Sequence, residues 1–316
     1  MDKYYFLLKT VVDKSFSKGA IIDTDAISES FQSNTLRTLI DDDMALLLTC
    51  SGFIPDVYGN DSSEETLFTK LVEVLVSEWA IRMGFESRFV KQKASYEDVN
   101  ITINGKVVVC DAKSFRLGRS QAAPNVKDFL KLEDIRKWLF RYKNKLGGLV
   151  TYPDTHEWSI KSDAYQYCST KDAPTIMLPY KYLSFLLINK ANYDVKKLES
   201  LWDYERLFPN PLSKDMPGGN RDAYWSVINN EIINITGLPR EDLQRHIQKS
   251  DTIIRDCVQS NLLNLEHRRQ SIINKIRHDV DSKDIENIRE DFAKYMINAE
   301  TSTIDVLIAR IKKFRL

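Results

Sequence analysis

The sequence predicts an α/β protein whose C-terminal third is helical. Between residues 99 and 103, apolar and polar residues alternate with a period of two, and residues 106–110 are mostly β-branched and apolar, both of which are typical of strands. Two short apolar runs, 147–152 and 174–178, indicate buried strands, and each has an amphipathic segment nearby. Beyond residue 220, apolar residues recur at helical spacing as far as Leu307. A central sheet flanked by helices and followed by several more helices accounts for all three observations.

The N-terminal part is expected to be mainly helical scaffold, which ends in a loop over residues 55–63. Ser62 followed three residues later by Glu65 is a capping-box pattern. Apolar residues then recur at helical spacing until Gly84. We therefore expect a helix over residues 64–83.

A β-hairpin is expected around Asn104-Gly105, a dipeptide that favours a type I′ turn. With a two-residue loop, Ile103 faces Lys106. Counting back along both strands then places Asp98 opposite Asp111, with both carboxylates on one face.

The segment after the hairpin is strongly basic and is expected to be helical from 126 to 145. Between Lys113 and Lys145 there are ten Lys or Arg residues and three acidic ones, although the whole chain has 45 basic and 45 acidic residues. Clustered cations, rather than total charge, determine how well a protein neutralises the phosphates of a nucleic acid. The local charge therefore allows a polyanionic partner that the overall charge does not reveal.

Residues 209–220 are the best linker candidate, because they hold three of the nine prolines and two adjacent glycines. We expect a core with an N-terminal helical scaffold over residues 1–208 and a linker-like loop over 209–220. Residues 221–316 are expected to form a helical region that packs on the core or lies in a dimer interface.

Composition excludes several classes of protein. The longest apolar runs fall far short of the roughly 18 residues that a membrane span needs. The N-terminus does not resemble a secretory signal, so the cytoplasm is the expected compartment. The four cysteines lack C-x-x-C spacing, which disfavours a disulfide framework or a zinc site. No phosphate-binding G-x-x-x-x-G-K-[ST] loop is present, so no nucleotide cofactor is expected.

Two acids and a lysine form the candidate site. Like charges directly opposite each other destabilise a sheet unless a positive charge separates them. Mg²⁺ suits this place, because it is bound by one or two carboxylates together with water and phosphate oxygens. Lys113 lies two residues beyond Asp111 on the same strand face, where its ammonium can hold a metal-bound water and oppose charge on a phosphate. The pattern predicts phosphodiester hydrolysis; the alternative is a surface ion pair, since D-x-K often occurs by chance.

Asp98 followed by Asp111-Ala112-Lys113 resembles the PD-(D/E)xK nuclease signature. The heptapeptide 111–117, DAKSFRL, is similar to the active-site strand of HindIII-type type II restriction endonucleases. One departure is Glu97, which stands where the signature has proline. The similarity extends through residues 52–55, 67–70, 149–151, 184–187 and 201–202.

The resemblance implies a restriction-endonuclease-like core, with a central mixed sheet flanked by helices. It also implies a homodimer that binds palindromic double-stranded DNA and cuts both strands with Mg²⁺, leaving 5′-phosphate ends. By the same resemblance Asp98, Asp111 and the Ala112 carbonyl bind the metal and Lys113 assists the attacking water. Glu73 on the preceding helix is a further candidate ligand, and its alternative is the solvated face of that helix.

Residues just beyond Lys113 are expected to lie closest to the cut DNA strand. Arg and Lys suit guanine, while Gln and Asn suit adenine, in the major groove. The alternative is that the basic run is a solvated helix face. The candidates for DNA contact are Ser114, Arg116, Arg119, Ser120, Gln121, Asn125 and Lys127.

Two other functions stay open at this point. A nuclease of this superfamily can act in DNA repair or mobile-element processing, where it recognises structure rather than sequence. A DNA-binding protein without catalysis is the second alternative, with the acid pair in a structural role. For a restriction enzyme, the resemblance makes an AAGCTT-like palindrome the leading expectation.

Overall fold

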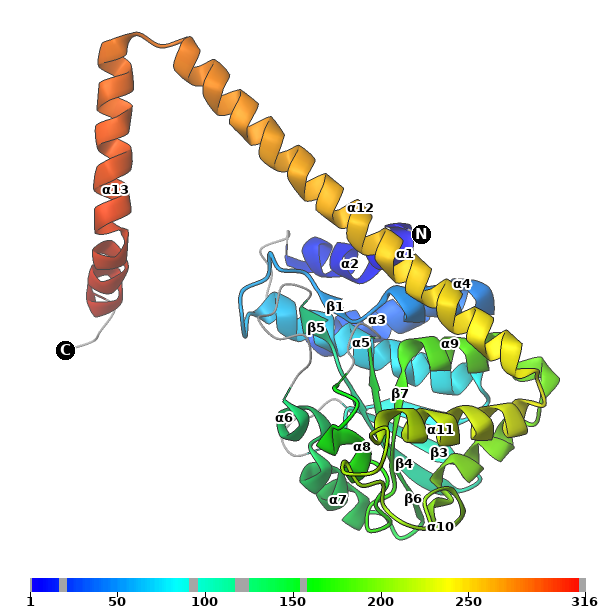
Figure 1. The fold of residues 1–316 in the computed structure, drawn as a ribbon. Helices are drawn as coiled ribbons and strands as arrows, with labels where there is room; N and C mark the ends of the chain where they lie inside the picture. Colours follow the sequence, from blue (N-terminus) through cyan, green and yellow to red (C-terminus); the bar gives the residue numbers. More distant parts are fainter. Residues whose placement is uncertain (1, 17–21, 91–95, 117–124, 154–157, 313–316) are drawn as a thin grey trace. The chain divides into compact units, whose positions relative to one another are not determined.

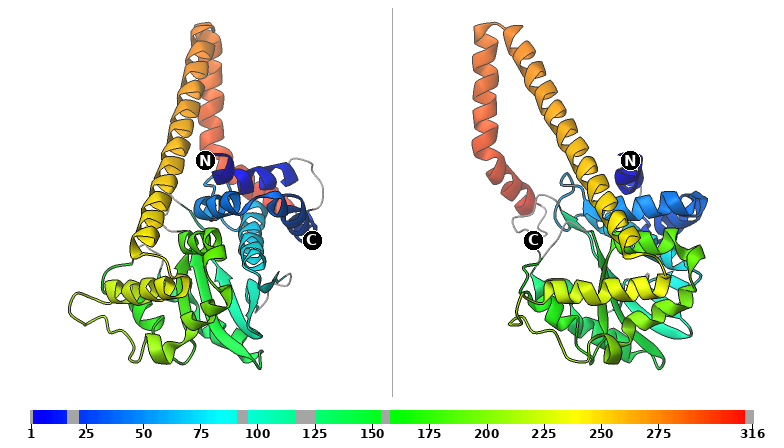
Figure 2. Two further views of the ribbon diagram at one scale, coloured as in Figure 1. Left: turned by 90° about the vertical axis from the view of Figure 1, so that its right-hand side faces the viewer. Right: turned by 45° about the vertical axis from the view of Figure 1, so that its right-hand side comes forward.

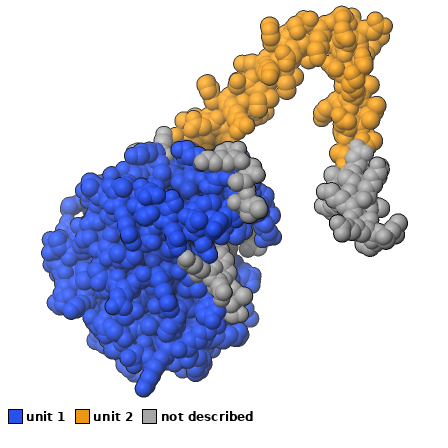
Figure 3. Space-filling model, turned by 180° about the vertical axis from the view of Figure 1, so that it is seen from behind, with its two compact units in different colours: residues 1–257 blue, residues 258–316 orange. Residues whose placement is uncertain are grey.

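The computed structural model describes residues 2–16, 22–90, 96–116, 125–153 and 158–312. The chain divides into two compact units, residues 1–257 and 258–316, which Figure 3 shows in different colours. The first unit holds the sheet and the helices around it. Residues 209–220 lie inside this unit, and their role as a boundary between functional regions stays a prediction.

The core of the first unit is a five-stranded mixed sheet with the order β2-β3-β4-β6-β7. The β2, β3 and β4 strands are antiparallel neighbours, whereas β4, β6 and β7 are parallel. This confirms the predicted α/β class with a central mixed sheet. The strands are β2 (Glu86–Phe89), β3 (Val99–Ile103), β4 (Lys106–Ala112), β6 (Lys145–Tyr152) and β7 (Thr175–Pro179). A separate parallel pair joins β1 (Phe53–Ile54) to β5 (Phe115–Arg116).

The β3–β4 hairpin has the predicted turn and register. Asn104 and Gly105 both have positive φ angles, 50° and 76°, as a type I′ turn requires. Ile103 pairs with Lys106, and the same register continues to the pair Val99 and Cys110. The turn chemistry alone therefore fixes which residues of the two strands meet.

The helix predicted over residues 64–83 is confirmed as α5 (Ser63–Arg82). Its N-cap is Ser62, whose hydroxyl oxygen accepts a hydrogen bond from the Glu65 amide at 3.2 Å. The N-terminal part is helical, as expected. Its elements are α1 (Asp2–Tyr5), α2 (Leu7–Phe16), α3 (Thr24–Asn34), the 3₁₀ turn η1 (Leu36–Thr38) and α4 (Asp41–Cys50).

The basic segment forms two short helices, α6 (Val126–Leu130) and α7 (Leu132–Phe140), rather than one helix reaching residue 145. Lys131 separates them because its backbone is left-handed, with a φ of 42°. Lys145 already belongs to strand β6. The later elements are α8 (Asp163–Tyr167), α9 (Tyr180–Ile188), η2 (Lys190–Asn192), η3 (Val195–Trp202), α10 (Tyr204–Leu207), α11 (Arg221–Thr236), α12 (Arg240–Asp281) and α13 (Ile285–Lys312).

Helices cover both faces of the sheet (Figures 1 and 2). A Cβ at Gly148 would lie 2.7 Å from the Ile135 side chain of α7. A Cβ at Gly147 would point to the opposite face of the sheet, where it would lie 2.3 Å from the Trp202 ring of η3. Strand β6 therefore needs both glycines, because α7 and η3 approach its backbone from opposite sides.

Helix α5 crosses strands β2, β3 and β4, and lies beside α9. Trp79 of α5 joins the two helices, since its indole nitrogen donates to the Leu183 carbonyl at 2.9 Å. Within the described ranges, no helix is long and apolar enough to cross a membrane. The four cysteines are buried and form no disulfide.

Candidate active site

The candidate site lies at the carboxyl end of β4, the central strand of the sheet. Asp111 is the last residue but one of this strand and is only 4% exposed. The four residues before it are apolar and pack in the core or at its edge. Lys113 follows directly after the strand, so an abrupt change from apolar to charged residues coincides with the end of β4.

Asp98 is fixed to β4 from the neighbouring strand. Its amide donates to the Cys110 carbonyl at 3.1 Å, and its Oδ2 accepts from the Ala112 amide at 2.9 Å. The regular ladder ends one pair earlier, so Asp98 bonds to both flanking residues of Asp111 instead of continuing the strict register. The structure nevertheless brings the two acids into electrostatic contact.

Burial and crowding of negative charge dominate the electrostatics here. Burial raises the pKa of Asp98 well above its usual value, and the charges of Glu73 and Asp111 raise it further. The Lys113 ammonium and the Ala112 amide lower this pKa, but they do not compensate fully. Ionisation of Asp98 is therefore unfavourable here unless a further positive charge is present.

Lys113 lies beside Asp111, with 2.6 Å between its Nζ and the Asp111 Oδ2. The ammonium also lies 5.7 Å from the centre of the Phe129 ring, within range of a cation–π contact. Phe129 is in turn packed against Phe115, Tyr152 and Trp158. An aromatic cluster therefore supports the lysine on one side while the carboxylate holds it on the other.

The backbone of Lys113 is held from two sides. Its amide donates to the Thr151 carbonyl of β6 at 2.8 Å. Its carbonyl accepts from the Tyr180 hydroxyl at 2.8 Å, at the start of α9. Pro153, which follows β6, has no amide proton to donate, and so the parallel ladder ends here.

Glu73 comes from the middle of α5 and is 4% exposed. The alternative that it belongs to a solvated helix face is therefore wrong. Its Oε2 pairs with the Lys70 ammonium at 2.7 Å, and its charge acts on Asp98. A metal-binding role for Glu73 stays a prediction.

Arg116 holds a loop. Its guanidinium donates to the Tyr58 carbonyl at 2.9 Å and to the Gly59 carbonyl at 3.2 Å, and it lies 3.0 Å from Glu65. The Ser114 hydroxyl oxygen is buried and has no hydrogen-bond partner among the described residues.

The other candidate DNA contacts lie on or before α6. Asn125 and Lys127 are exposed, and the Asn125 side chain caps α6 by accepting from the Lys127 amide at 3.0 Å. Arg119, Ser120 and Gln121 lie outside the described residues. DNA contact stays a prediction for all seven candidates.

The donors at this site fit a hard divalent cation. Asp98, Asp111 and the Ala112 peptide offer oxygen ligands, and a cation would favour the ionised form of Asp98, which burial and the neighbouring acids disfavour. Within the part of the chain that the structure describes, no three acidic, histidine or cysteine side chains lie close enough together to hold a metal ion, so Glu73, Asp98 and Asp111 are not assembled as a set of three ligands. A cation here would share a small number of carboxylates with backbone, water and phosphate oxygens, which is the manner in which Mg²⁺ binds.

Sequence reasoning did not identify Lys70 or Tyr180. A signal was available for Lys70, because it lies three residues before Glu73 within a mostly apolar stretch and so shares a helix face with it. Tyr180 had no local signal, because its contact with Lys113 depends on how α9 packs against the sheet.

A mixed sheet flanked by helices, with acids and a lysine at the end of its central strand, defines a restriction-endonuclease-like α/β protein. The sequence profile of the HindIII restriction endonuclease matches residues 10–296. The chain is also 24% identical over 271 residues to the "Type II restriction enzyme HindIII" of Haemophilus influenzae, and the alignment covers 84% of each chain. The chain belongs to the HindIII restriction endonuclease family. This confirms the resemblance and places the protein among DNA-binding nucleases of restriction systems, enzymes that generally use divalent metal ions.

Proposed function

We propose that the protein is a Mg²⁺-dependent type II restriction endonuclease that cuts both strands of a palindromic DNA site and leaves 5′-phosphate ends. The observation that carries the proposal is the placement of Asp98, Asp111 and Lys113 together at the end of β4 in a chain of this family. In this role it acts in the cytoplasm and needs no nucleotide cofactor.

In this proposal each charged group of the site has a role in metal binding or in catalysis. Asp98, Asp111 and the Ala112 carbonyl hold Mg²⁺, with Glu73 as a further acidic ligand. Bound Mg²⁺ supplies Lewis acidity toward the phosphate and lowers the pKa of water. Lys113 orients the attacking water and opposes the charge that builds on the phosphate oxygens. The raised pKa of Asp98 supports this, because a cation relieves the crowding that raises it.

Replacement of either catalytic group tests the chemistry. Asp111→Asn and Lys113→Ala should each slow cleavage at least about a hundredfold, while DNA affinity changes by less than about tenfold, because the groups act mostly in the transition state. Cleavage is measured on plasmid DNA with Mg²⁺, and binding by fluorescence anisotropy without Mg²⁺. Lys171→Ala, which removes an exposed lysine paired with Glu205, is the matched control and should cut normally. Normal cutting by either site variant would contradict the assignment.

The DNA ends test the type of enzyme. Digestion of an intact plasmid should give discrete bands, and sequencing of their ends identifies the site, with AAGCTT as the first candidate. Ligation of the fragments without prior kinase treatment tests for 5′-phosphates. Cutting that depends on nicks or branched structures would favour a repair or mobile-element nuclease. DNA binding without cutting under any divalent ion would favour a non-catalytic protein.

We place DNA contacts on the residues after Lys113, because these leave the site directly. Arg116 acts there partly by holding the loop at residues 55–59, while exposed Asn125 and Lys127 are free to meet a DNA strand. The complete set of proposed contacts is Ser114, Arg116, Arg119, Ser120, Gln121, Asn125 and Lys127.

A homodimer completes the proposal, because symmetric cutting of a palindrome needs two sites. We assign residues 1–208 to the nuclease core, 209–220 to a linker-like loop and 221–316 to a helical region that packs on the core, as α11 does, or lies in the dimer interface. The second unit supports a dimer interface, because large apolar side chains are exposed along both of its helices, mostly three, four or seven residues apart. They include Leu262, Leu265, Ile272, Ile276 and Val280 on α12, and Ile285, Phe292, Tyr295 and Met296 on α13.

A second copy is the occupant that fits this surface. Each of these side chains is between 42% and 70% exposed, and a surface that leaves many large apolar side chains in contact with water is typical of a protein–protein interface. Residues 268–277 are basic and 284–291 are mainly acidic, so the two segments of one chain complement those of another.

Sedimentation equilibrium tests the interface. The wild-type chain should have twice its 36.6 kDa mass. The double variant Ile272→Asp, Ile276→Asp should be monomeric, while the control Gln270→Glu on another part of the helix surface stays dimeric. A dimeric double variant would place the interface elsewhere, and a monomeric wild type would contradict the homodimer itself.

A further inference from the structure

Lys70 is a buried lysine that lies one helical turn from Glu73. It is 2% exposed, and an ammonium in the interior costs several kcal/mol unless its donors are satisfied. Its Nζ donates to Glu73 Oε2 at 2.7 Å and to the Val90 carbonyl. The Phe89 ring lies on another side, with its centre 5.4 Å from the Nζ. Each of these three contacts therefore favours the positive charge.

Val90 connects this lysine to the candidate site. The Val90 carbonyl accepts from Lys70, and the Val90 amide donates to the Asp98 carbonyl at 3.0 Å. The Asp98 amide then donates to the Cys110 carbonyl of β4. A continuous chain of hydrogen bonds runs from the α5 ammonium to the strand that carries Asp111.

We propose that Lys70 is a positioning residue of the active site. One ammonium fixes the Glu73 carboxylate and, through Val90, the backbone of Asp98, so that acids from two different elements keep their relative positions. The inference rests on the proposed function, because it takes these acids to be those of the site. Lys70 is too buried to contact DNA, and it acts only through Glu73 and Val90.

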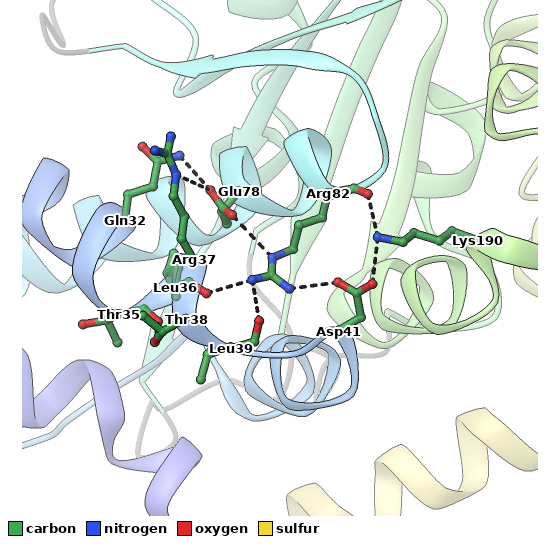
Figure 4. Close-up of polar contacts among 10 residues, drawn as sticks. All are labelled: Gln32, Thr35, Leu36, Arg37, Thr38, Leu39, Asp41, Glu78, Arg82 and Lys190. Atoms are coloured by element: carbon green, nitrogen blue, oxygen red, sulfur yellow. Dashed lines mark hydrogen bonds and ion pairs between the residues drawn. The ribbon is translucent and has the colours of Figure 1, made fainter.

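A purely structural ion pair is the competing explanation, and the same helix supplies a control for it. Arg82 is a second, partly buried cation of α5, with its side chain 12% exposed. It donates to Asp41 and to the Leu36 and Leu39 carbonyls, and pairs with Glu78 (Figure 4). Twelve residues separate it from Lys70, about 18 Å along the helix. Loss of Arg82 therefore weakens α5 without touching the Val90 connection.

The experiment compares Lys70→Met, Lys70→Arg and Arg82→Met with the wild-type chain. Hydrogen exchange of peptides covering residues 86–90 and 96–112 is measured without DNA or metal ions. Single-turnover cleavage at saturating Mg²⁺ reports the chemical step, and anisotropy reports DNA affinity. Thermal unfolding records the loss of stability in each variant.

Lys70→Met should raise the hydrogen-exchange rate around Val90 and Asp98 at least about tenfold. Without the ammonium, local opening of this segment no longer has to break hydrogen bonds to Lys70, so opening costs less free energy. The substitution should slow single-turnover cleavage at least about thirtyfold, since small misplacements of reacting groups are costly, while DNA affinity stays within about twofold. Lys70→Arg keeps donors for both partners and should recover most of the rate. Arg82→Met should lose stability but keep wild-type exchange and cleavage in these assays.

Wild-type exchange at residues 86–90 and 96–112 together with a wild-type cleavage rate in Lys70→Met would overturn the proposal. It would also be overturned if Arg82→Met showed the changes in exchange and rate that are expected of Lys70→Met. If the methionine variant does not fold, Lys70→Gln, which keeps a neutral donor, decides the same question. A wild-type chain without nuclease activity would remove the proposed function, but the exchange measurements would still decide whether Lys70 positions Asp98.

Discussion

Replacement of Asp98 by asparagine should stabilise the protein in the absence of divalent cations. Burial and the neighbouring charges of Glu73 and Asp111 raise the pKa of Asp98, so its ionised form opposes folding at neutral pH. Asparagine keeps an oxygen that can accept from the Ala112 amide, the contact that now holds Asp98. The substitution therefore removes the unfavourable charge and preserves the bond.

The size of the effect follows from the charge balance. Two like charges about 4 Å apart repel by about 4 kcal/mol at the effective dielectric of a protein surface, and by less at greater separation. Lys113 already offsets part of this, since it lies 2.6 Å from Asp111. We expect a net gain of about 1–2 kcal/mol in the free energy of unfolding, which corresponds to a rise of about 2–8 °C in Tm for a unit of this size.

The pH dependence has a defined sign. An acid whose pKa is raised on folding stabilises the protein at low pH, and this contribution is lost as the pH rises through the folded pKa. The advantage of Asp98→Asn over the wild-type chain should therefore grow as the pH rises from the acid range toward neutrality.

Thermal unfolding in EDTA and in Mg²⁺ measures both effects. Mg²⁺ should raise the Tm of the wild-type chain but not that of Asp98→Asn, which should also lose cleavage. Asp172→Asn, at a side chain that is 84% exposed, is the control and should shift the Tm by less than about 1 °C. A variant less stable than the wild-type chain in EDTA would show that Asp98 is held by favourable partners, and the reasoning would be refuted.

Three further predictions concern other parts of the molecule. Burial lowers the pKa of His246 to about 4. Below pH 6.5 this side chain is therefore protonated in the unfolded chain but stays neutral in the folded chain until the pH approaches 4. Up to about 2 kcal/mol of stability should be lost at pH 5, and acid titration of His246→Gln should show a smaller loss. Gly147→Ala would place a Cβ 2.2 Å from the Pro174 carbonyl oxygen, and urea unfolding should show a loss of about 2–3 kcal/mol. Lys127→Ala should reduce the slope of log affinity for DNA against log salt by about 1, and an unchanged slope would exclude a phosphate contact.

The predictable parts of the fold are those specified over a short stretch of chain. The hairpin register follows from one dipeptide, because a type I′ turn fixes the pairing of both strands. Strand β2 (Glu86–Phe89) escaped prediction because its pairing with β3 and its packing on α5 come from distant residues. The break at Lys131 also escaped, since neither glycine nor proline marks it.

The residues of the candidate site likewise divide into those that the local sequence predicts and those that depend on tertiary packing. Asp98, Asp111 and Lys113 lie on one hairpin and its exit, so strand periodicity was enough to group them. Glu73 could be named only as a candidate, because a helical pattern does not show which face meets the sheet end. Its burial against Lys70 is a tertiary fact. Sequence reasoning placed Arg116 near the site but could not show that its guanidinium holds the loop before α5.

The charge balance links the metal to the substrate. If Asp98 is ionised, as binding of a cation would favour, Glu73, Asp98 and Asp111 together carry three negative charges, against two positive charges on Lys70 and Lys113. One negative charge remains, so a divalent cation alone leaves the cluster with one excess positive charge. A DNA phosphodiester carries a single negative charge and restores neutrality. Because charges in a buried site are screened only weakly, the state with both the cation and the DNA phosphate bound is favoured over a state with only one of them bound. Cation and DNA should therefore each raise the affinity for the other by the same factor.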